Sequence, residues 1–181
     1  MTGLRLDAGA TGPSGRLARS EGFTLIELLV TITVAAVLLA FAAPSFQNAS
    51  LSSKLSDNAN RLVASAAMAR SEAIKRNSPV TLCASADAGS CAVTGSWEQG
   101  WIVLSGTTVV RHEPPAPSGF KIIEASAIRT ISFQPTGVGS TQATFIVCRA
   151  TPTPGTQERE VTVSATGRAS IRRPATAGSC S

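Results

Sequence analysis

The chain has 181 residues, of which 43% are hydrophobic and 4% aromatic, with no tyrosine. A domain usually takes about 100–150 residues, so this length allows one compact domain and an additional segment. The formal net charge is +5 and the only histidine is His112. Because the sequence also lacks a nucleophile elbow and a phosphate loop, we expect no enzyme activity, no cofactor, no metal and no small-molecule substrate.

A long apolar segment, broken by one charge, follows the first 22 residues. Residues 1–22 are rich in Gly, Ala, Ser and Arg and have no apolar periodicity. Residues 23–43 are apolar apart from a single charge, Glu27. In a helix with a rise of about 1.5 Å per residue, this segment would span about 30 Å, the thickness of the hydrocarbon core of a bilayer. The sequence therefore predicts one transmembrane helix.

The basic residues around this segment predict its orientation. Arg5, Arg16 and Arg19 precede the segment, and the next basic residue after it is Lys54. Cytoplasmic flanks of transmembrane helices carry an excess of Lys and Arg. We therefore expect a cytoplasmic N-terminus, and a C-terminal part that lies on the periplasmic side of a bacterial inner membrane.

A helical pattern continues after the apolar segment, over residues 44–78. Apolar residues recur there at spacings of three and four, while charged residues occupy the other faces. This pattern predicts an amphipathic helix that packs on other elements, with a bend near Pro44. The helix is expected to end at Asn77 and Ser78, because the residue before Pro79 is disfavoured in helical conformation. The residues of the apolar stripe are Leu51, Leu55, Ala59, Leu62, Ala66, Ala69 and Ala73.

Residues 79–181 change to short β-prone runs separated by Gly, Pro and Ser. This order predicts an α+β fold in which a long N-terminal helix, half transmembrane and half amphipathic, packs on an antiparallel β-sheet head. Trp101, with apolar neighbours, is expected in the core. Gly137 and Gly167 are expected in turns that need a positive φ angle. The predicted strands are 80–84, 100–105, 108–112, 120–124, 129–133, 143–148 and 159–164.

Four cysteines lie in this C-terminal part: Cys83, Cys91, Cys148 and Cys180. Their spacing contains no C-x-x-C pair, which makes a zinc site improbable. An even number of cysteines in a translocated domain indicates disulfides. Three pairings are open, and we favour Cys83–Cys91 with Cys148–Cys180 because each joins near neighbours in chain order.

The sequence Gly22-Phe23-Thr24-Leu25-Ile26-Glu27-Leu28 resembles the processing signal of type IV pilins and pseudopilins. The resemblance implies removal of residues 1–22 by a prepilin peptidase and methylation of the new amino terminus on Phe23. It also implies that Glu27 is the acid at the fifth mature position and that Pro44 is the helix-kinking proline.

Glu27 is also unusual on physical grounds. A carboxylate inside a hydrophobic span costs about 2.5–3.5 kcal/mol on insertion scales, so such a group usually has a function and a partner. The resemblance supplies the Phe23 ammonium of the same or a neighbouring subunit. The alternative is an acid near the helix end that extends to the interface.

The rest of the chain resembles the GspH/FimT branch of minor pseudopilins and minor pilins. The motifs are Ala69-Arg70-Ser71-Glu72-Ala73-Ile74, Pro79-Val80-Thr81-Leu82-Cys83, Gly100-Trp101-Ile102-Val103, Ile131-Ser132-Phe133-Gln134-Pro135 and Val163-Ser164-Ala165-Thr166-Gly167-Arg168. The resemblance implies a leader at 1–22, a transmembrane helix at 23–43, a helix continuation at 44–78 and a periplasmic head at 79–181. It implies a filament subunit with other pilins as partners, in type II secretion or in type IV pili.

A basic tail gives an alternative function. FimT-like proteins carry a Gly-Arg-x-Arg pattern that is associated with DNA, and here Gly167-Arg168-Ala169-Ser170 keeps only its first arginine. Arg172 and Arg173 follow and restore the charge but not the pattern. Because phosphate contacts do not depend on sequence, these three arginines could bind DNA during uptake. The competing interpretation is an exposed loop held by a disulfide.

Overall fold

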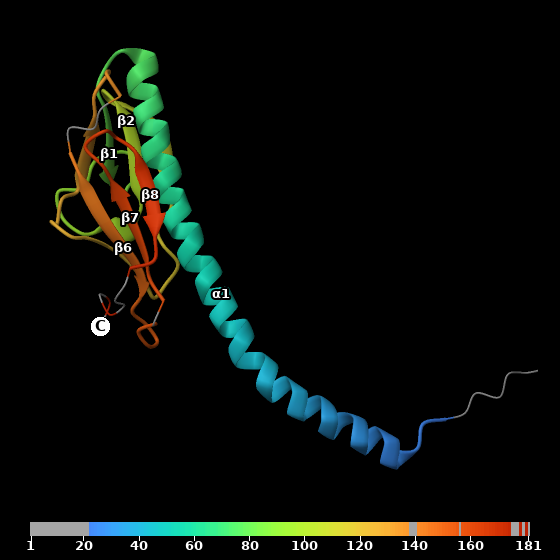
Figure 1. Ribbon diagram of the computed structural model, residues 1–181. Coiled ribbons are helices and arrows are strands. Elements are labelled where there is room, and N and C mark those ends of the chain that lie inside the picture. Colours follow the sequence, from blue (N-terminus) through green and yellow to red (C-terminus); the bar gives the residue numbers. More distant parts are fainter. Residues whose placement is uncertain (1–21, 138–140, 156, 175–177, 179, 181) are drawn as a thin grey trace, which may run out of the picture. The chain divides into compact units, whose positions relative to one another are not determined.

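A computed structural model describes residues 22–137, 141–155, 157–174, 178 and 180, except for the side chains of residues 42–45. Residues 1–21 of the expected leader, 1–22, lie outside the described residues. The chain divides into two compact units, Met1–Ala43 and Pro44–Ser181. Helix α1 (Leu25–Arg76) contributes to both units (Figure 1).

In the first unit, α1 is long and apolar enough to cross a membrane. Its large apolar side chains are exposed, from Leu25 at 81% to Phe41 at 77%. The hydroxyls of Thr31 and Thr33 donate to the carbonyls of Leu28 and Val30, each at 2.8 Å. These bonds satisfy the polar groups inside the helix, as an apolar environment requires.

In the second unit, α1 buries the apolar stripe that the sequence predicts. All seven residues from Leu51 to Ala73 are buried, and six of them are fully inaccessible. The helix ends where expected, because Asn77 takes a positive φ of 47°. The backbone N–H groups of Asn77 and Ser78 then donate to the carbonyls of Ile74 and Ala73, both at 3.3 Å. This pattern is a Schellman motif, which satisfies carbonyls at a helix end.

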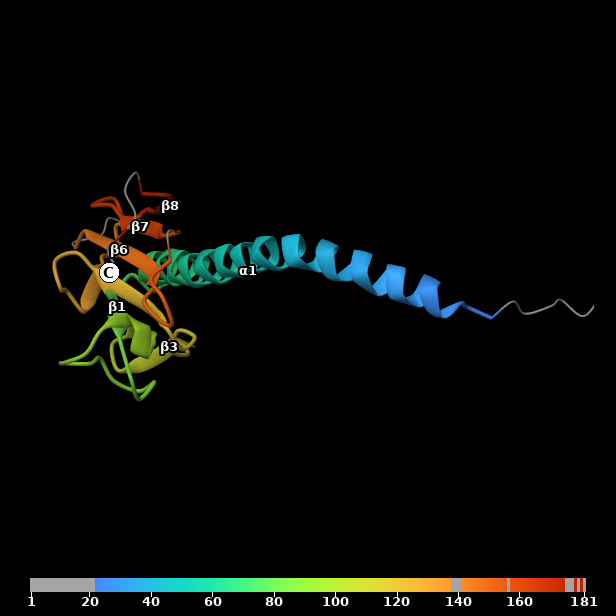
Figure 2. The same cartoon turned by 90° about the horizontal axis from the view of Figure 1, so that it is seen from below.

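The head contains two four-stranded antiparallel sheets. Sheet A has the order β3 (Thr108–Glu113), β2 (Trp101–Ser105), β1 (Val80–Ala84), β5 (Thr130–Phe133). Sheet B has the order β4 (Phe120–Glu124), β6 (Ala143–Arg149), β7 (Arg159–Val163), β8 (Ala169–Arg172). A short 3-10 helix, η1 (Trp97–Gln99), precedes β2. Figure 2 shows β1 and β3 of sheet A on one side of the head and β6, β7 and β8 on the other.

The α+β prediction is confirmed, and the seven predicted strands are present with ends that differ by at most one residue. The competing interpretation of the basic tail as an exposed loop does not hold for residues 169–172, which form β8. This strand pairs with β7 through its backbone, with Val161 opposite Ile171. It is a sheet edge with mostly exposed side chains, so it lacks the apolar alternation by which a strand is recognised.

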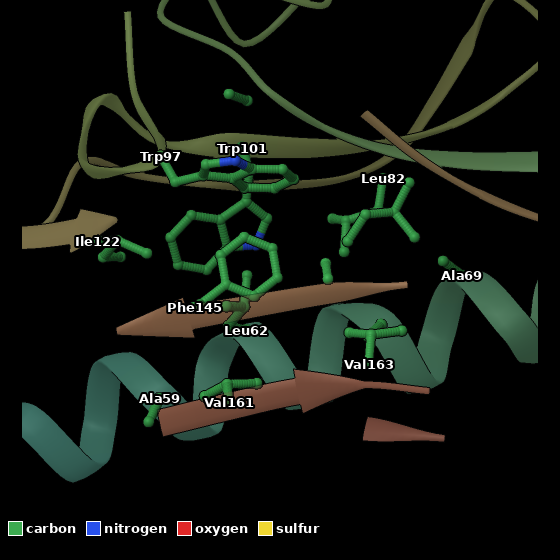
Figure 3. Packing of buried hydrophobic residues seen from close by; sticks show 14 of the residues in the cluster. Ala59, Leu62, Ala69, Leu82, Trp97, Trp101, Ile122, Phe145, Val161 and Val163 are labelled. Atoms are coloured by element: carbon green, nitrogen blue, oxygen red, sulfur yellow. The ribbon is translucent and has the colours of Figure 1, made fainter. Parts of the chain in front are cut away.

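The core of the head lies between α1 and the sheets (Figure 3). Trp97 and Phe145 meet edge to face, with ring centroids 4.9 Å apart. Trp101 is fully buried, as predicted, and its Nε1 donates to Ser65 Oγ on α1 at 2.9 Å. Trp97 Nε1 donates to the Ile128 carbonyl at 2.9 Å. Both indole N–H groups are therefore satisfied, which buried tryptophans require.

Every buried apolar residue in the described part of the chain lies at Leu51 or beyond. Residues 44–181 therefore contain the complete described core and form a separate compact unit. Two disulfides reinforce this unit, Cys83–Cys91 and Cys148–Cys180, with Cα atoms 5.5 and 5.9 Å apart. They have the pairing that chain order favours. Gly137 and Gly167 have φ angles of 76° and 69°, as the turn prediction requires.

Candidate functional site

The N-terminal segment begins with an exposed, extended stretch. Gly22, Phe23 and Thr24 precede α1 and are exposed. A Cβ atom placed on Gly22 would meet nothing within 4 Å. The peptide bond between Gly22 and Phe23 is thus unobstructed by any described residue of this chain.

Thr24 and Glu27 define the start of the helix. The Glu27 backbone N–H donates to Thr24 Oγ1 at 3.2 Å, and the Leu28 N–H donates to the Thr24 carbonyl at 3.1 Å. Thr24 is therefore the N-cap, and Glu27 occupies the third helical position, the spacing of a capping box. The site is built by local sequence alone, because every contact joins residues within four positions.

Glu27 carries an exposed carboxylate without a side-chain partner among the described residues. A negative charge in the first helical turn interacts favourably with the helix dipole. That interaction offsets only a small part of the cost of placing a carboxylate in an apolar span. The arrangement leaves Glu27 free to pair with a cation from outside the described part of the chain.

Pro44 lies within α1, and its side chain is outside the described residues. The bend expected there stays a prediction.

The three tail arginines do not form one patch. Arg172 is engaged by Glu160, whose Oε1 accepts from Arg172 Nε at 2.8 Å and from Nη2 at 2.6 Å. Arg168 precedes β8 and Arg173 follows it, so the two exposed side chains stand at opposite ends of this strand. At about 3.3 Å per residue, five residues separate them by about 17 Å.

Arg168 lies beside helix α1. It lines an open pocket of about 410 Å³ with Arg70, Ser71 and Ile74. Arg70 Nε donates to the Gly137 carbonyl at 2.6 Å, so this arginine also holds the turn after β5. Two guanidinium groups from distant parts of the sequence therefore face one hollow, which is suitable for an anionic group.

Arg173 lies near a second arginine, Arg159, which the sequence analysis did not single out. Arg159 is only 6% exposed. Its Nε and Nη2 donate to Ser56 Oγ and Ser52 Oγ on α1 at 3.2 and 2.8 Å, and its Nη1 donates to the Glu158 carbonyl at 2.9 Å. Burial lowers the pKa of Arg159, and the positive charge of Arg173 lowers it further.

A signal for Arg159 exists in the sequence. Side chains alternate between the faces of a strand, so Arg159 shares a face with Val161 and Val163, which are fully buried. An arginine in phase with core valines predicts a buried cation.

An exposed apolar helix with a threonine N-cap, followed by a head of antiparallel sheets packed on the same helix, defines a pilin-like protein. Comparisons with known proteins agree with this class. Residues 58–167 match the family described as type II transport protein GspH, and residues 17–43 match the prokaryotic N-terminal methylation motif. A search of curated proteins gives no match.

Among solved structures, the chain is similar to the type IV minor pilin FimU of Pseudomonas aeruginosa in two crystal forms. The TM-scores are 0.55 and 0.53, each at 22% sequence identity. The matches cover 71% and 70% of this chain and 96% and 100% of the FimU chains. At this identity, the similarity supports the fold alone.

The chain belongs to the GspH family. It is a minor pseudopilin or minor pilin of a type II secretion system or type IV pilus, and hence a structural subunit and not an enzyme.

Proposed function

We propose that this subunit is cleaved after Gly22, methylated on Phe23, held in the inner membrane by α1 with its head in the periplasm, and drawn from there into a filament. There it acts in filament assembly, for protein secretion or for pilus biogenesis. Its partners are prepilin peptidase and other pilin or pseudopilin subunits.

The observation that carries this proposal is the carboxylate of Glu27, which has no side-chain partner among the described residues. It lies in the first turn of a helix whose N-terminal apolar side chains are exposed. Cleavage after Gly22 would create a new ammonium group on Phe23, four residues before Glu27. An ion pair between Glu27 and the ammonium of a neighbouring subunit would neutralise both charges in an apolar environment, where unpaired charges are costly.

Replacing Glu27 tests this role. The substitutions Glu27→Ala and Glu27→Gln should leave membrane insertion intact, because each removes a charge from an apolar span. Both should reduce recovery of the subunit in sheared, affinity-purified filaments. Thr31→Ala, which changes a satisfied hydroxyl one turn further on, serves as the matched control and should be recovered like the wild type. Equal recovery of Glu27→Ala and wild type would contradict the pairing role.

DNA uptake is the second candidate function, and the pocket that Arg168 and Arg70 share favours it. Duplex DNA binding by residues 44–181 should fall steeply with salt, with a slope of about 0.9 per phosphate contact on a log–log scale. Arg168→Gln removes one phosphate contact and should therefore reduce this slope by about 0.9. Arg76→Gln, which removes a surface arginine at the end of α1, should leave it unchanged. Absence of binding by the wild-type head at near-physiological salt would remove DNA as a partner.

A further inference from the structure

Arg159 is a buried cation without an anionic partner in the described part of the chain. No ion pair joins it to a carboxylate there, and its three hydrogen bonds go to two hydroxyls and one carbonyl. A guanidinium has five N–H donors, so two of them are left over. Removing a cation from water without a counter-charge is costly. The site therefore favours a bound anion.

The surroundings of Arg159 increase this preference. Glu160 pairs with Arg172 in the antiparallel register of β7 and β8, so Arg173, the next residue, lies beside Arg159, and its side chain is exposed. The carboxylate of Glu160 could compensate these charges, but it is occupied by Arg172. The Glu158 carboxylate accepts from the backbone of Gly178 at 2.9 Å. Two neighbouring guanidinium groups repel each other unless an anion lies between them.

The same end of sheet B carries a third arginine, and it lies against the first turns of α1 in the head. Arg149 ends β6, and the pairing of Val147 with Arg159 places it at this end of the sheet. Gly155 lies against Leu51, because a Cβ atom placed on this glycine would be 3.2 Å from Leu51 Cδ2. Gln157 Nε2 donates to the Asn48 carbonyl at 3.4 Å. The connection from β6 to β7 therefore runs along helix residues 48–56.

This stretch of helix follows the apolar segment closely in the chain. Ser52 comes nine residues after Ala43, and nine helical residues span about 13 Å. The headgroup layer of a bilayer adds about 5–8 Å beyond the hydrocarbon core on each side. On this rise Ser52 lies at most about 5–8 Å beyond the headgroup layer, a gap that the long, exposed side chain of Arg173 can cover.

We propose that Arg159 and Arg173, supported by Ser52, Ser56 and Arg149, form a binding site for the phosphate of an anionic phospholipid on the periplasmic face of the membrane. Arginine binds phosphate oxygens through charge-assisted, often bidentate hydrogen bonds. The bound headgroup would hold the head on the membrane before assembly and would have to be released when the subunit enters a filament. The membrane location of this site rests on the function proposed above.

Vesicle binding tests this proposal. The fragment 44–181 contains the described core, so it can be studied without the apolar segment. It should co-sediment with vesicles of phosphatidylcholine and phosphatidylglycerol, and not with vesicles of phosphatidylcholine alone. A basic residue near an anionic surface contributes about 1 kcal/mol, so Arg173→Gln should weaken binding about fivefold. Arg76→Gln makes the same change of charge at the end of α1 and should not weaken binding.

Arg159 is tested by Arg159→Lys, which keeps the charge and should weaken binding because it loses the planar donor geometry. Circular dichroism identifies any loss of fold. If Arg173→Gln and Arg76→Gln weaken vesicle binding equally, the binding depends only on the net charge of the head. This result would overturn the proposed site. If inorganic phosphate saturates the site at Arg173 while the head does not bind vesicles, the ligand is the free ion. This result would overturn the proposal that the ligand is a phospholipid.

Binding of another pilin subunit through Arg173, without vesicle binding, would assign the site to a protein carboxylate and also overturn the proposal. None of these outcomes affects the role of Glu27, because filament recovery is measured separately on the full chain.

Discussion

At the scale of single residues, the sequence predicted side chains whose role depends on near neighbours. Asn77 follows from the helix-stop signal before Pro79, and its positive φ angle confirms that stop, whereas the N-cap role of Thr24 was not predicted. The sequence also did not predict Arg61, which contacts three groups far away in sequence. Arg61 lies over the Trp101 ring at 5.3 Å, its Nε donates to Glu113 at 2.9 Å, and its Nη2 donates to the Pro114 carbonyl at 2.8 Å. Such contacts depend on which strand packs beside the helix. The sequence around Arg61 does not specify that strand.

Glu113 is the acidic residue that Arg61 contacts. Its carboxylate is 7% exposed and pairs with Arg61 and Arg111. Burial raises the pKa of Glu113, but the hydrogen bonds and charges of the two arginines outweigh it and lower the pKa overall. Because the pKa is lower in the folded state, the ionised carboxylate stabilises the fold above its unfolded pKa of about 4.3. This contribution is lost as pH falls through the lowered folded value.

We therefore expect Glu113→Gln to reduce the free energy of unfolding of residues 44–181 by about 1–3 kcal/mol at neutral pH. Thermal melts from about pH 7 to about pH 3 should show this difference shrinking in acid, because the wild-type carboxylate becomes protonated. Glu72→Gln removes a carboxylate whose partners, Lys75 and Arg76, are exposed, so this change should alter stability little at any pH. A difference for Glu113→Gln that is constant over this range would rule out the ion pairs as its cause.

At the scale of elements, the sequence predicted the helix face and seven strands, because both have a clear apolar period. β8 was missed, since an edge strand is held by backbone hydrogen bonds, and residues 169–172 have mostly exposed side chains. The division into two sheets was also not predicted. Strand order depends on contacts such as β1 with β5, which are separated by some forty-five residues of sequence.

The small residues of the helix face allow α1 to approach the sheets closely. Ala69 is fully buried, whereas Ala64 is exposed on the same helix. Ala69→Leu should reduce the free energy of unfolding by about 1–3 kcal/mol, because the larger side chain overpacks the core. Ala64→Leu makes the same change on the surface and should be nearly neutral. Urea unfolding of residues 44–181 measures both, and equal midpoints for the two variants would refute the packing account.

The Cys148–Cys180 disulfide ties the end of the chain to β6 over 32 residues, whereas Cys83–Cys91 spans eight. Replacing Cys148 and Cys180 with alanine should cost about 2–5 kcal/mol. The loop-entropy difference between the two bridges is about 1 kcal/mol, so the paired replacement of Cys83 and Cys91 should cost less by that amount. Thermal unfolding compares the variants. Free thiols or crossed pairs in a non-reducing peptide map would show that these bridges are wrong.

At the scale of the whole molecule, the sequence analysis ends the apolar segment at Ala43 and begins the head at Pro79, whereas the second compact unit of the structure begins at Pro44 and includes the amphipathic half of α1. Composition separates the apolar segment from the head, because a continuous apolar run differs from strands punctuated by Gly and Pro. The arginine arrangement was not predictable in the same way. Arg168 and Arg173 are close in sequence, but the extended strand between them directs one toward Arg70 and the other toward Arg159.

The most direct test of the account is the mass of the N-terminal peptide of the protein extracted from the membranes of cells with an active prepilin peptidase. The account predicts a mature chain that begins at Phe23 and carries a methyl group on its amino terminus. A chain that retains residues 1–22, in cells where other prepilins are cleaved, would contradict the assignment of this protein as a processed filament subunit.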